Sequence, residues 1–246
     1  MAWFVVPAYN EEANLPRLLA DLELRRELWH GGGVLLVDDG STDGTVAVAH
    51  EHRGELPLIV VRQMRNQGAG RAFDRGFRRA LQLASDDELI VTLESDTTSD
   101  LDAVQEMLAK ARAGADVVLA SHHDGGELVN VGAHRRFLSK AAAYAIRRSA
   151  GLEARTVSSF FRVYRVAALR AAYERYGDDF IRESGFACKA EILIKMSNLG
   201  LRVAEVPVSL DWSRREGESK LRVLPTMQGY ARLMIRQVGA ARERAS

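Results

Sequence analysis

The sequence has little cysteine, no marked excess of either positive or negative charge, and no long hydrophobic run. It has 246 residues and one cysteine, Cys188. An internal disulfide framework is therefore excluded, and we expect a reducing compartment. The formal net charge of +1 lacks the basic excess of a dedicated nucleic-acid binder, so we expect no nucleic-acid partner.

Segments that would place the chain in or across a membrane are also missing. No apolar run reaches the roughly 18–20 residues that a membrane-spanning helix needs. The apolar stretch 3–6 is too short for the hydrophobic region of a signal peptide. We therefore expect a cytoplasmic protein, either free or peripheral at the cytoplasmic membrane face.

Hydrophobic residues make up 47% of the chain, which suffices for a large core, and they alternate between two periodicities. The pattern predicts strands at 2–6, 33–38, 57–62, 88–93 and 116–120, with helices near 11–28, 43–53, 69–84 and 100–113. Thr42 and Asp43, and then Ser99 and Asp100, supply helix caps. Such alternation indicates βαβ units, hence an α/β fold with a mostly parallel sheet flanked by helices.

After residue 121 the pattern becomes less regular. We expect a loop at 121–126, a basic helix at 135–150, a strand at 160–164, helices at 165–176 and 186–199, and a strand at 202–208. No linker interrupts the chain. The sequence predicts one continuous domain over 1–246, in which the regular part at 1–121 is followed by an elaborated part at 122–222 and an amphipathic helix at 223–246.

Two strands end in carboxylates, which should face solvent, a ligand or a metal. In open α/β sheets ligands bind at the carboxyl ends of strands. Asp38 and Asp39 follow one strand, while Pro7, Tyr9 and Glu11 follow another. A base and ribose could lie across these ends, with Tyr9 on the base. The alternative is that the Asp38–Asp39 run only forms a turn and a helix cap.

Glu94 and Asp96 end a third strand, separated by Ser95. Magnesium and manganese are typically held by one or two carboxylates plus phosphate oxygens. One acid can therefore bind ribose while the other binds a metal that bridges a diphosphate. Such triplets are common by chance, and the position at a strand end gives this one its weight.

Basic residues in the second half are candidates for phosphate binding. Arg pairs bidentately with phosphate, and Lys acts as a point charge. The candidates are Arg135, Arg136, Arg214 and Lys220. Taken alone, each of them is more often a solvated surface cation than a phosphate contact. Gly217 in the charged loop suggests a segment that closes over bound phosphate.

Several motifs together resemble family 2 glycosyltransferases of the GT-A fold. They are the runs 5–12, 37–45 and 66–70. The runs 159–165, 205–208 and 217–221, with Gly185, Phe186 and Glu191, are similar to polyprenyl-phosphate mannose synthases. The resemblance spans residues 2–222, almost the whole chain.

The resemblance implies inverting transfer of a sugar, mannose or glucose favoured, from a nucleotide sugar to a polyprenyl phosphate. A GDP-sugar donor would be favoured over a UDP-sugar, with Mg or Mn as cofactor. By the same resemblance, residues 1–121 would form a Rossmann-like nucleotide-sugar-binding half and residues 122–222 an acceptor half. The residues that would contact the nucleoside are Pro7, Tyr9, Glu11 and Asp39. Asp96 would bind the metal, with Glu94 reaching either metal or ribose. Arg135, Arg214 and Lys220 would contact phosphate.

The chain departs from the family pattern at four positions. Glu94 replaces an Asp, and His122 stands where the family commonly has Arg. Thr156 and Phe160 replace Asp and Gly. These changes leave open two alternatives, a soluble small-molecule acceptor or a nucleotide-sugar-binding protein without catalysis.

Two basic amphipathic stretches could contact a membrane surface. One carries Leu138, Ala142 and Ile146 among arginines. The other is the C-terminal stretch, with Leu224, Met227, Leu233 and Val238 on its apolar side. Packing on the protein's own core, or a homodimer contact, is the alternative for both.

Overall fold

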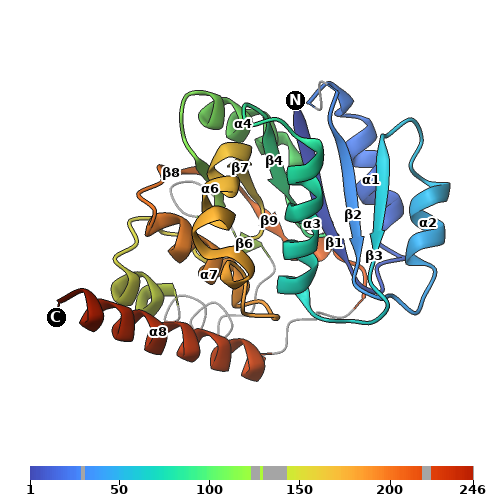
Figure 1. Cartoon of the computed structure of the whole chain (residues 1–246). Coiled ribbons are helices and arrows are strands. Elements are labelled where there is room, and N and C mark those ends of the chain that lie inside the picture. Colours follow the sequence, from blue (N-terminus) through green and yellow to red (C-terminus); the bar gives the residue numbers. More distant parts are fainter. Residues whose placement is uncertain (29–30, 123–127, 130–142, 218–222, 246) are drawn as a thin grey trace.

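Runs of branched and aliphatic residues form the central sheet of this computed structural model, which describes residues 1–28, 31–122, 128–129, 143–217 and 223–245 (Figure 1). Seven strands lie in the order β3-β2-β1-β4-β7-β5-β8. Their bounds are Ala2–Ala8 (β1), Gly33–Asp38 (β2), Leu58–Arg62 (β3), Leu89–Thr92 (β4), Val117–Ser121 (β5), Arg162–Arg165 (β7) and Val203–Pro207 (β8). Every pairing is parallel except those of β7, which runs antiparallel to β4 and β5.

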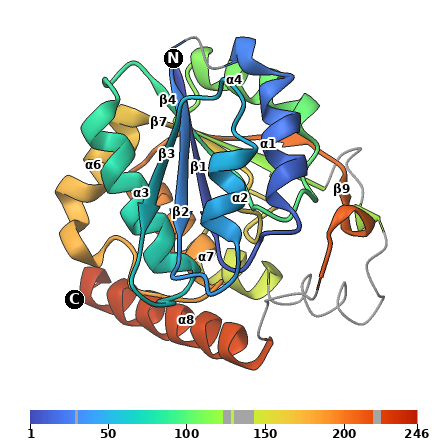
Figure 2. The same cartoon turned by 90° about the vertical axis from the view of Figure 1, so that its right-hand side faces the viewer.

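Helices cover both faces of this sheet, as Figure 2 shows edge-on. They are α1 (Leu15–Glu23), α2 (Thr45–Glu51), α3 (Ala69–Leu83), α4 (Val104–Arg112), α6 (Val166–Tyr176), α7 (Cys188–Ser197) and α8 (Val223–Ala245); residues 143–150 are also helical. One apolar core joins the sheet to α1 and α4, and the other joins it to α3, α6 and α7. Because both faces are covered, β2 is buried along its whole length.

Two predicted helices are shorter in the structure. The one expected at 11–28 begins at Leu15 with Pro16 in its first turn, and it ends at Glu23 before a separate 3-10 turn at Arg26–Leu28. The one expected at 100–113 starts with a 3-10 turn at Leu101–Ala103. The predicted cap there is present, since the Asp100 side chain accepts a hydrogen bond from the Asp102 N–H. Pro16 suits the first turn of α1 because proline has no backbone N–H, and an N–H at that position would have no partner within the helix.

A second, two-stranded parallel sheet was not predicted. It pairs β6 (Leu128–Val129) with β9 (Leu210–Asp211). Strands of two residues carry too little periodicity to be seen in a sequence. A 3-10 turn at Trp212–Arg214 follows β9 and brings the predicted phosphate-binding loop to the sheet.

The C-terminal helix α8 crosses the end of the molecule at which the parallel strands terminate (Figures 1 and 2). Its inner side packs on the α7 core through Tyr230 and Leu233, which are almost fully buried. Leu224 and Ile235 on its outer side are exposed. Within the described part of the chain, no helix has both the length and the hydropathy to cross a membrane.

Candidate active site

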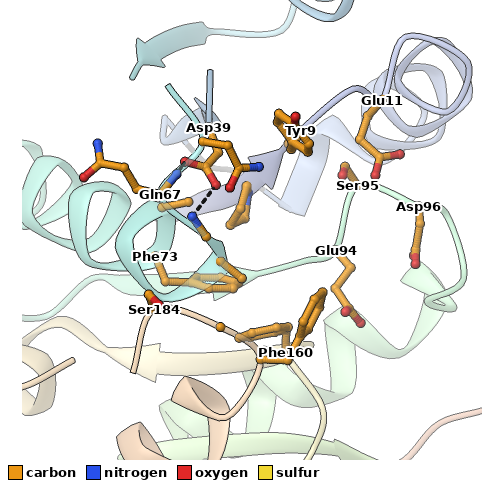
Figure 3. A pocket seen from close by; sticks show the side chains of 18 of the residues that line it. Tyr9, Glu11, Asp39, Gln67, Phe73, Glu94, Ser95, Asp96, Phe160 and Ser184 are labelled. Atoms are coloured by element: carbon orange, nitrogen blue, oxygen red, sulfur yellow. Dashed lines mark hydrogen bonds between the residues drawn. The ribbon is translucent and has the colours of Figure 1, made fainter. Parts of the chain in front are cut away.

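A pocket of about 820 Å³ opens where β1, β2 and β4 end. Strand register explains its position, because Ala8 pairs with Asp38 and Val5 with Thr92, so the three strand ends meet at one edge. In Figure 3 Asp39 lies at one end and Glu11, Ser95 and Asp96 lie at the other, with Tyr9 between Asp39 and Glu11. The volume is in the range typical of ligand sites, about 300–1,000 Å³.

Asp39 lines the pocket and is fixed by three donors. Its carboxylate accepts hydrogen bonds from Gln63 Nε2, Gln67 N and Gly68 N, each at 2.8 Å. Burial raises the pKa of Asp39, and the two backbone N–H groups oppose that rise. Gly68 has φ +93°, a left-handed conformation that turns its N–H toward the carboxylate. Asp39 is thus a preoriented acceptor for an N–H or O–H of a ligand.

Asp38 has a different role from the one expected of a strand-end carboxylate. It is fully buried, accepts a hydrogen bond from Ser41 N at 2.9 Å and forms an ion pair with Arg62 at 3.2 Å. The expectation that it faces solvent, a ligand or a metal was wrong, and the turn interpretation holds for this residue. The residue at the N-cap of α2 is Gly44, which has no side chain to cap the helix, so the cap expected from Thr42 and Asp43 is not formed at that position. Asp43, one residue earlier, accepts a hydrogen bond from Thr45 N at 3.0 Å.

The end of β1 supplies Pro7, Tyr9 and Glu11 to the pocket wall. Glu11 is buried, and its carboxylate accepts a hydrogen bond from Asn14 Nδ2 at 2.7 Å. Asn14 also bonds the backbone of Glu216 in both directions, at 2.9 and 3.1 Å. The start of α1 therefore anchors the loop that follows β9.

Glu94 and Asp96 lie at the opposite end of the pocket from Asp39 (Figure 3). Asp96 accepts a hydrogen bond from the Thr98 hydroxyl at 2.8 Å and pairs with Arg215 at 3.1 Å. Burial raises the pKa of the half-buried Glu94, and the negative charges of Asp96 and Glu11 add to the rise, while Lys189 and Arg215 oppose it. This side of the pocket is therefore crowded with negative charge.

Such a donor set fits a divalent cation that completes its coordination with ligand oxygens. No group of three His, Cys, Asp or Glu side chains able to hold a metal occurs among the described residues. One or two carboxylates are what magnesium and manganese use when phosphate oxygens provide the rest. Arg215 now supplies the positive charge beside Asp96.

Of the predicted phosphate-binding residues, the structure describes only Arg214. Arg214 does not line the pocket: its guanidinium pairs with Asp21 of α1 at 3.3 Å. Its neighbour Arg215 lines the pocket instead. Arg135, Arg136 and Lys220 lie outside the described residues, as do Leu138 and Ala142 of the predicted basic helix.

Sequence reasoning missed Arg215 and also Lys189. The Lys189 ammonium lies 4.4 Å from the ring centroid of Phe160 and 5.2 Å from that of Phe186, and both rings line the pocket. Burial lowers the pKa of Lys189, while Glu94 is the strongest influence in the opposite direction. One signal was available, because a lysine in the first turn of the almost entirely buried helix α7 is unusual.

Comparison with known families decides the class of protein. The profile described as "Glycosyl transferase family 2" matches residues 3–172, more than half of the chain.

This chain belongs to glycosyl transferase family 2.

Similar proteins support the assignment. An undecaprenyl-phosphate mannosyltransferase of Micrococcus luteus is 31% identical over 219 residues, covering 88% of this chain and 86% of the relative. A polyprenol monophosphomannose synthase of Mycolicibacterium smegmatis is 28% identical over 220 residues, covering 88% and 79%.

Solved structures confirm the GT-A fold expected from the sequence. Glucosyl-3-phosphoglycerate synthase of Mycobacterium tuberculosis, crystallised with Mn²⁺, UDP-glucose and phosphoglyceric acid, superposes with a TM-score of 0.64 at 19% identity. The match covers 97% of this family 2 glycosyltransferase and 78% of the solved chain. The family assignment also confirms the predicted enzyme class, a glycosyltransferase.

Proposed function

We propose that this glycosyltransferase moves a hexose, mannose or glucose favoured, from a nucleoside-diphosphate sugar to a polyprenyl phosphate, with inversion at the sugar. The observation that carries the proposal is that one pocket holds Asp39 at one end and the Asp96–Arg215 pair at the other. Support for the acceptor comes from the two relatives that are named for polyprenyl substrates.

The nucleoside binds at the end of the pocket near Asp39. The carboxylate, held by Gln63 and two backbone N–H groups, accepts a hydrogen bond from the base. Tyr9 lies between Asp39 and Glu11 (Figure 3) and offers a ring for stacking. Pro7 and Glu11, which also line the pocket, remain our proposed nucleoside contacts, with Glu11 toward the Asp96 end. We favour guanine over uracil on the resemblance to mannose synthases.

The diphosphate lies at the Asp96 end, where the residues fit Mg²⁺ or Mn²⁺. Asp96 would hold the metal, and Glu94 would reach either the metal or the ribose. The chemistry that a bound cation would supply is neutralisation of the charge on the departing diphosphate. Arg215 is placed to contact the same phosphates, because it already lies against Asp96.

The acceptor phosphate oxygen attacks the anomeric carbon as the bond from that carbon to the diphosphate oxygen breaks. A phosphate is already ionised at neutral pH, so no strong general base is needed. Positioning and preorganised charge supply the catalysis. Arg135, Arg214 and Lys220 remain our proposed phosphate contacts, with Arg214 required to leave Asp21 to act.

Sugar transfer assays test the proposal directly. Purified protein with Mn²⁺ is incubated with GDP-mannose or UDP-glucose, and with undecaprenyl phosphate, a water-soluble phosphate acceptor, or none. We expect transfer only with the lipid phosphate, and loss of transfer in Asp96→Ala. Transfer to the soluble acceptor without detergent would favour the soluble alternative, and nucleotide binding without any transfer would favour a non-catalytic role.

We also propose that the outer side of α8 contacts a membrane surface at its cytoplasmic face. Leu224, Met227 and Ile235 are exposed there, while the first turn of α8 lines the pocket through Pro225 and Thr226. A lipid-borne phosphate must reach the pocket beside this turn. Co-sedimentation with anionic vesicles should be lost in Leu224→Glu/Ile235→Glu; a dimer that dissociates in this variant would instead identify a homodimer contact.

A further inference from the structure

Glu183 lies beside the pocket and is held by two arginines of α8. Its carboxylate is 4% exposed and accepts hydrogen bonds from Arg232 Nη2 at 2.6 Å, Arg232 Nε at 3.2 Å and Arg236 Nη1 at 3.3 Å. We call Glu183, Arg232 and Arg236 the Glu183 clasp. Because a buried carboxylate without cations is costly, the seating of α8 stabilises the segment that carries Glu183.

The backbone of that segment is fixed on two other sides. Glu183 N donates to Glu191 Oε2 of α7 at 2.8 Å, and Ser184 O accepts from Gly70 N at 2.7 Å. The backbone of Glu183 and Ser184 packs directly against the start of α3, with no room for a side chain between them. A Cβ added at Gly70 would lie 1.9 Å from Glu183 O, and one at Gly68 would lie 2.5 Å from Ser184 O.

The loop on the other side of this contact is the one that holds Asp39. Gln67 N and Gly68 N donate to its carboxylate. An unbroken series of contacts thus runs from α8 through Glu183 and Ser184 to residues 67–70, where the chain enters α3, and on to Asp39. Close-packed contacts of this kind shift together rather than deform separately.

We propose that Glu183 is a positioning residue that couples the seating of α8 to nucleotide binding at Asp39. The inference rests on the proposed function only for the ligand, a nucleoside diphosphate. Coupling of this kind is reciprocal, so nucleotide binding must hold α8 more firmly in return. α8 lines the same pocket through Pro225 and Thr226. The two coupled parts, α8 and Asp39, therefore border one ligand site.

A double-mutant cycle on the clasp tests the coupling. Glu183→Gln, Arg232→Gln and the double variant are titrated calorimetrically with GDP and with UDP in the presence of Mn²⁺. We expect each single change to raise the Kd about tenfold, within the usual range of coupling between sites, and the double change to add little more. Arg25→Gln is the matched control, since Arg25 contacts Asp102 at 2.6 and 3.0 Å without lining the pocket.

A merely structural role would lower the melting temperature and leave the Kd unchanged, which would overturn the proposal. If Glu183→Gln fails to fold, Arg232→Lys takes its place with the same expected direction. Hydrogen exchange gives the reciprocal readout: nucleotide should slow exchange of the α8 amides in the wild-type chain, and less so in the variants. Exchange that nucleotide does not alter would also count against coupling.

The outcomes separate this inference from the proposed function. A chain that transfers no sugar, but whose Kd still rises in Glu183→Gln, ends the proposed function and keeps the coupling. If the wild-type chain transfers sugar but the Kd of Glu183→Gln equals that of the wild type, the proposed function stands and the coupling is overturned. A wild-type chain that binds neither nucleotide overturns both.

Discussion

Neighbouring residues at the end of β2 have opposite roles. Asp39 lines the pocket, and Asp38 is buried in the turn with Ser41 and Arg62. The sequence predicts an acidic strand end but not which acid faces the ligand. That choice depends on the path of the chain through Gly40, whose φ is +72° and where a Cβ would lie within 2.4–2.8 Å of the backbone of residues 65 and 66.

Replacing the two aspartates should separate binding from stability. Asp39→Asn puts an amide donor among Gln63, Gln67 and Gly68, which are themselves donors, so we expect nucleotide Kd to rise about tenfold or more, the cost of a lost charged hydrogen bond of roughly 1.5–3 kcal/mol. Asp38→Asn should lower the melting temperature with little change in Kd. Equal effects of both on Kd, measured by calorimetry, would contradict these roles.

Two buried groups that lose a proton only at alkaline pH, the Cys188 thiol and the Tyr230 hydroxyl, should make the protein less stable there. Burial raises the pKa of the Cys188 thiol from 9.0, and that of the Tyr230 hydroxyl from 10.0, each to about 12. The folded chain therefore keeps protons that the unfolded chain loses. The free energy of unfolding should be unaffected by these groups below pH 9 and should fall between about pH 9 and 12, by up to about 1.4 kcal/mol per pH unit and group.

Urea unfolding at pH 8, 9, 10 and 11 measures this loss, and Cys188→Ala/Tyr230→Phe should reduce its slope. Burial also raises the pKa of Tyr164 and Tyr173, so some slope remains in the double variant. Rapid alkylation of Cys188 in the folded protein at pH 8 would show that the thiol is not buried and neutral as described.

At the scale of elements, periodicity predicted most strands and helices but not how some of them pair. β7 was expected at 160–164 and occurs at Arg162–Arg165, yet its antiparallel place between β4 and β5 depends on contacts distant in sequence. Arg214 and Arg215 show the same limit. Bonds between Asn14 and the Glu216 backbone hold the loop in a position in which Arg215 faces Asp96, and Arg214 pairs with Asp21.

The packing of α8 on α7 should be sensitive to one glycine. A Cβ at Gly229 would lie 2.6 Å from the Cβ of Ala187. Alanine is favoured over glycine inside a helix by about 1 kcal/mol, but overpacking costs typically about 1–3 kcal/mol. We therefore expect Gly229→Ala to lower the free energy of unfolding in urea, whereas Gln228→Ala at the exposed neighbouring position should change it little. A stabilised Gly229→Ala protein would show that α8 is not seated this closely.

At the scale of the molecule, the pocket draws on strand ends, the segment at 183–186 and α8, so a bound ligand should stabilise the whole chain. GDP or UDP with Mn²⁺ at about 100 times its Kd should add about 2.7 kcal/mol to the free energy of unfolding. A thermal-shift screen with GDP, UDP, CDP and dTDP measures this and ranks the bases. In Asp96→Asn the nucleotide should still bind, but Mn²⁺ should no longer increase the shift; an unchanged effect of Mn²⁺ would remove Asp96 from the metal site.

The position of β7 has a consequence for synthesis on the ribosome. β4 and β5 lie on either side of it, so each exposes an unpaired edge until residues 162–165 have emerged. A nascent chain that stops near residue 121 cannot complete its sheet, although it already contains most of the residues that we propose to contact the nucleotide. We expect such a fragment to aggregate or to recruit chaperones, and the ligand site to form only late in translation.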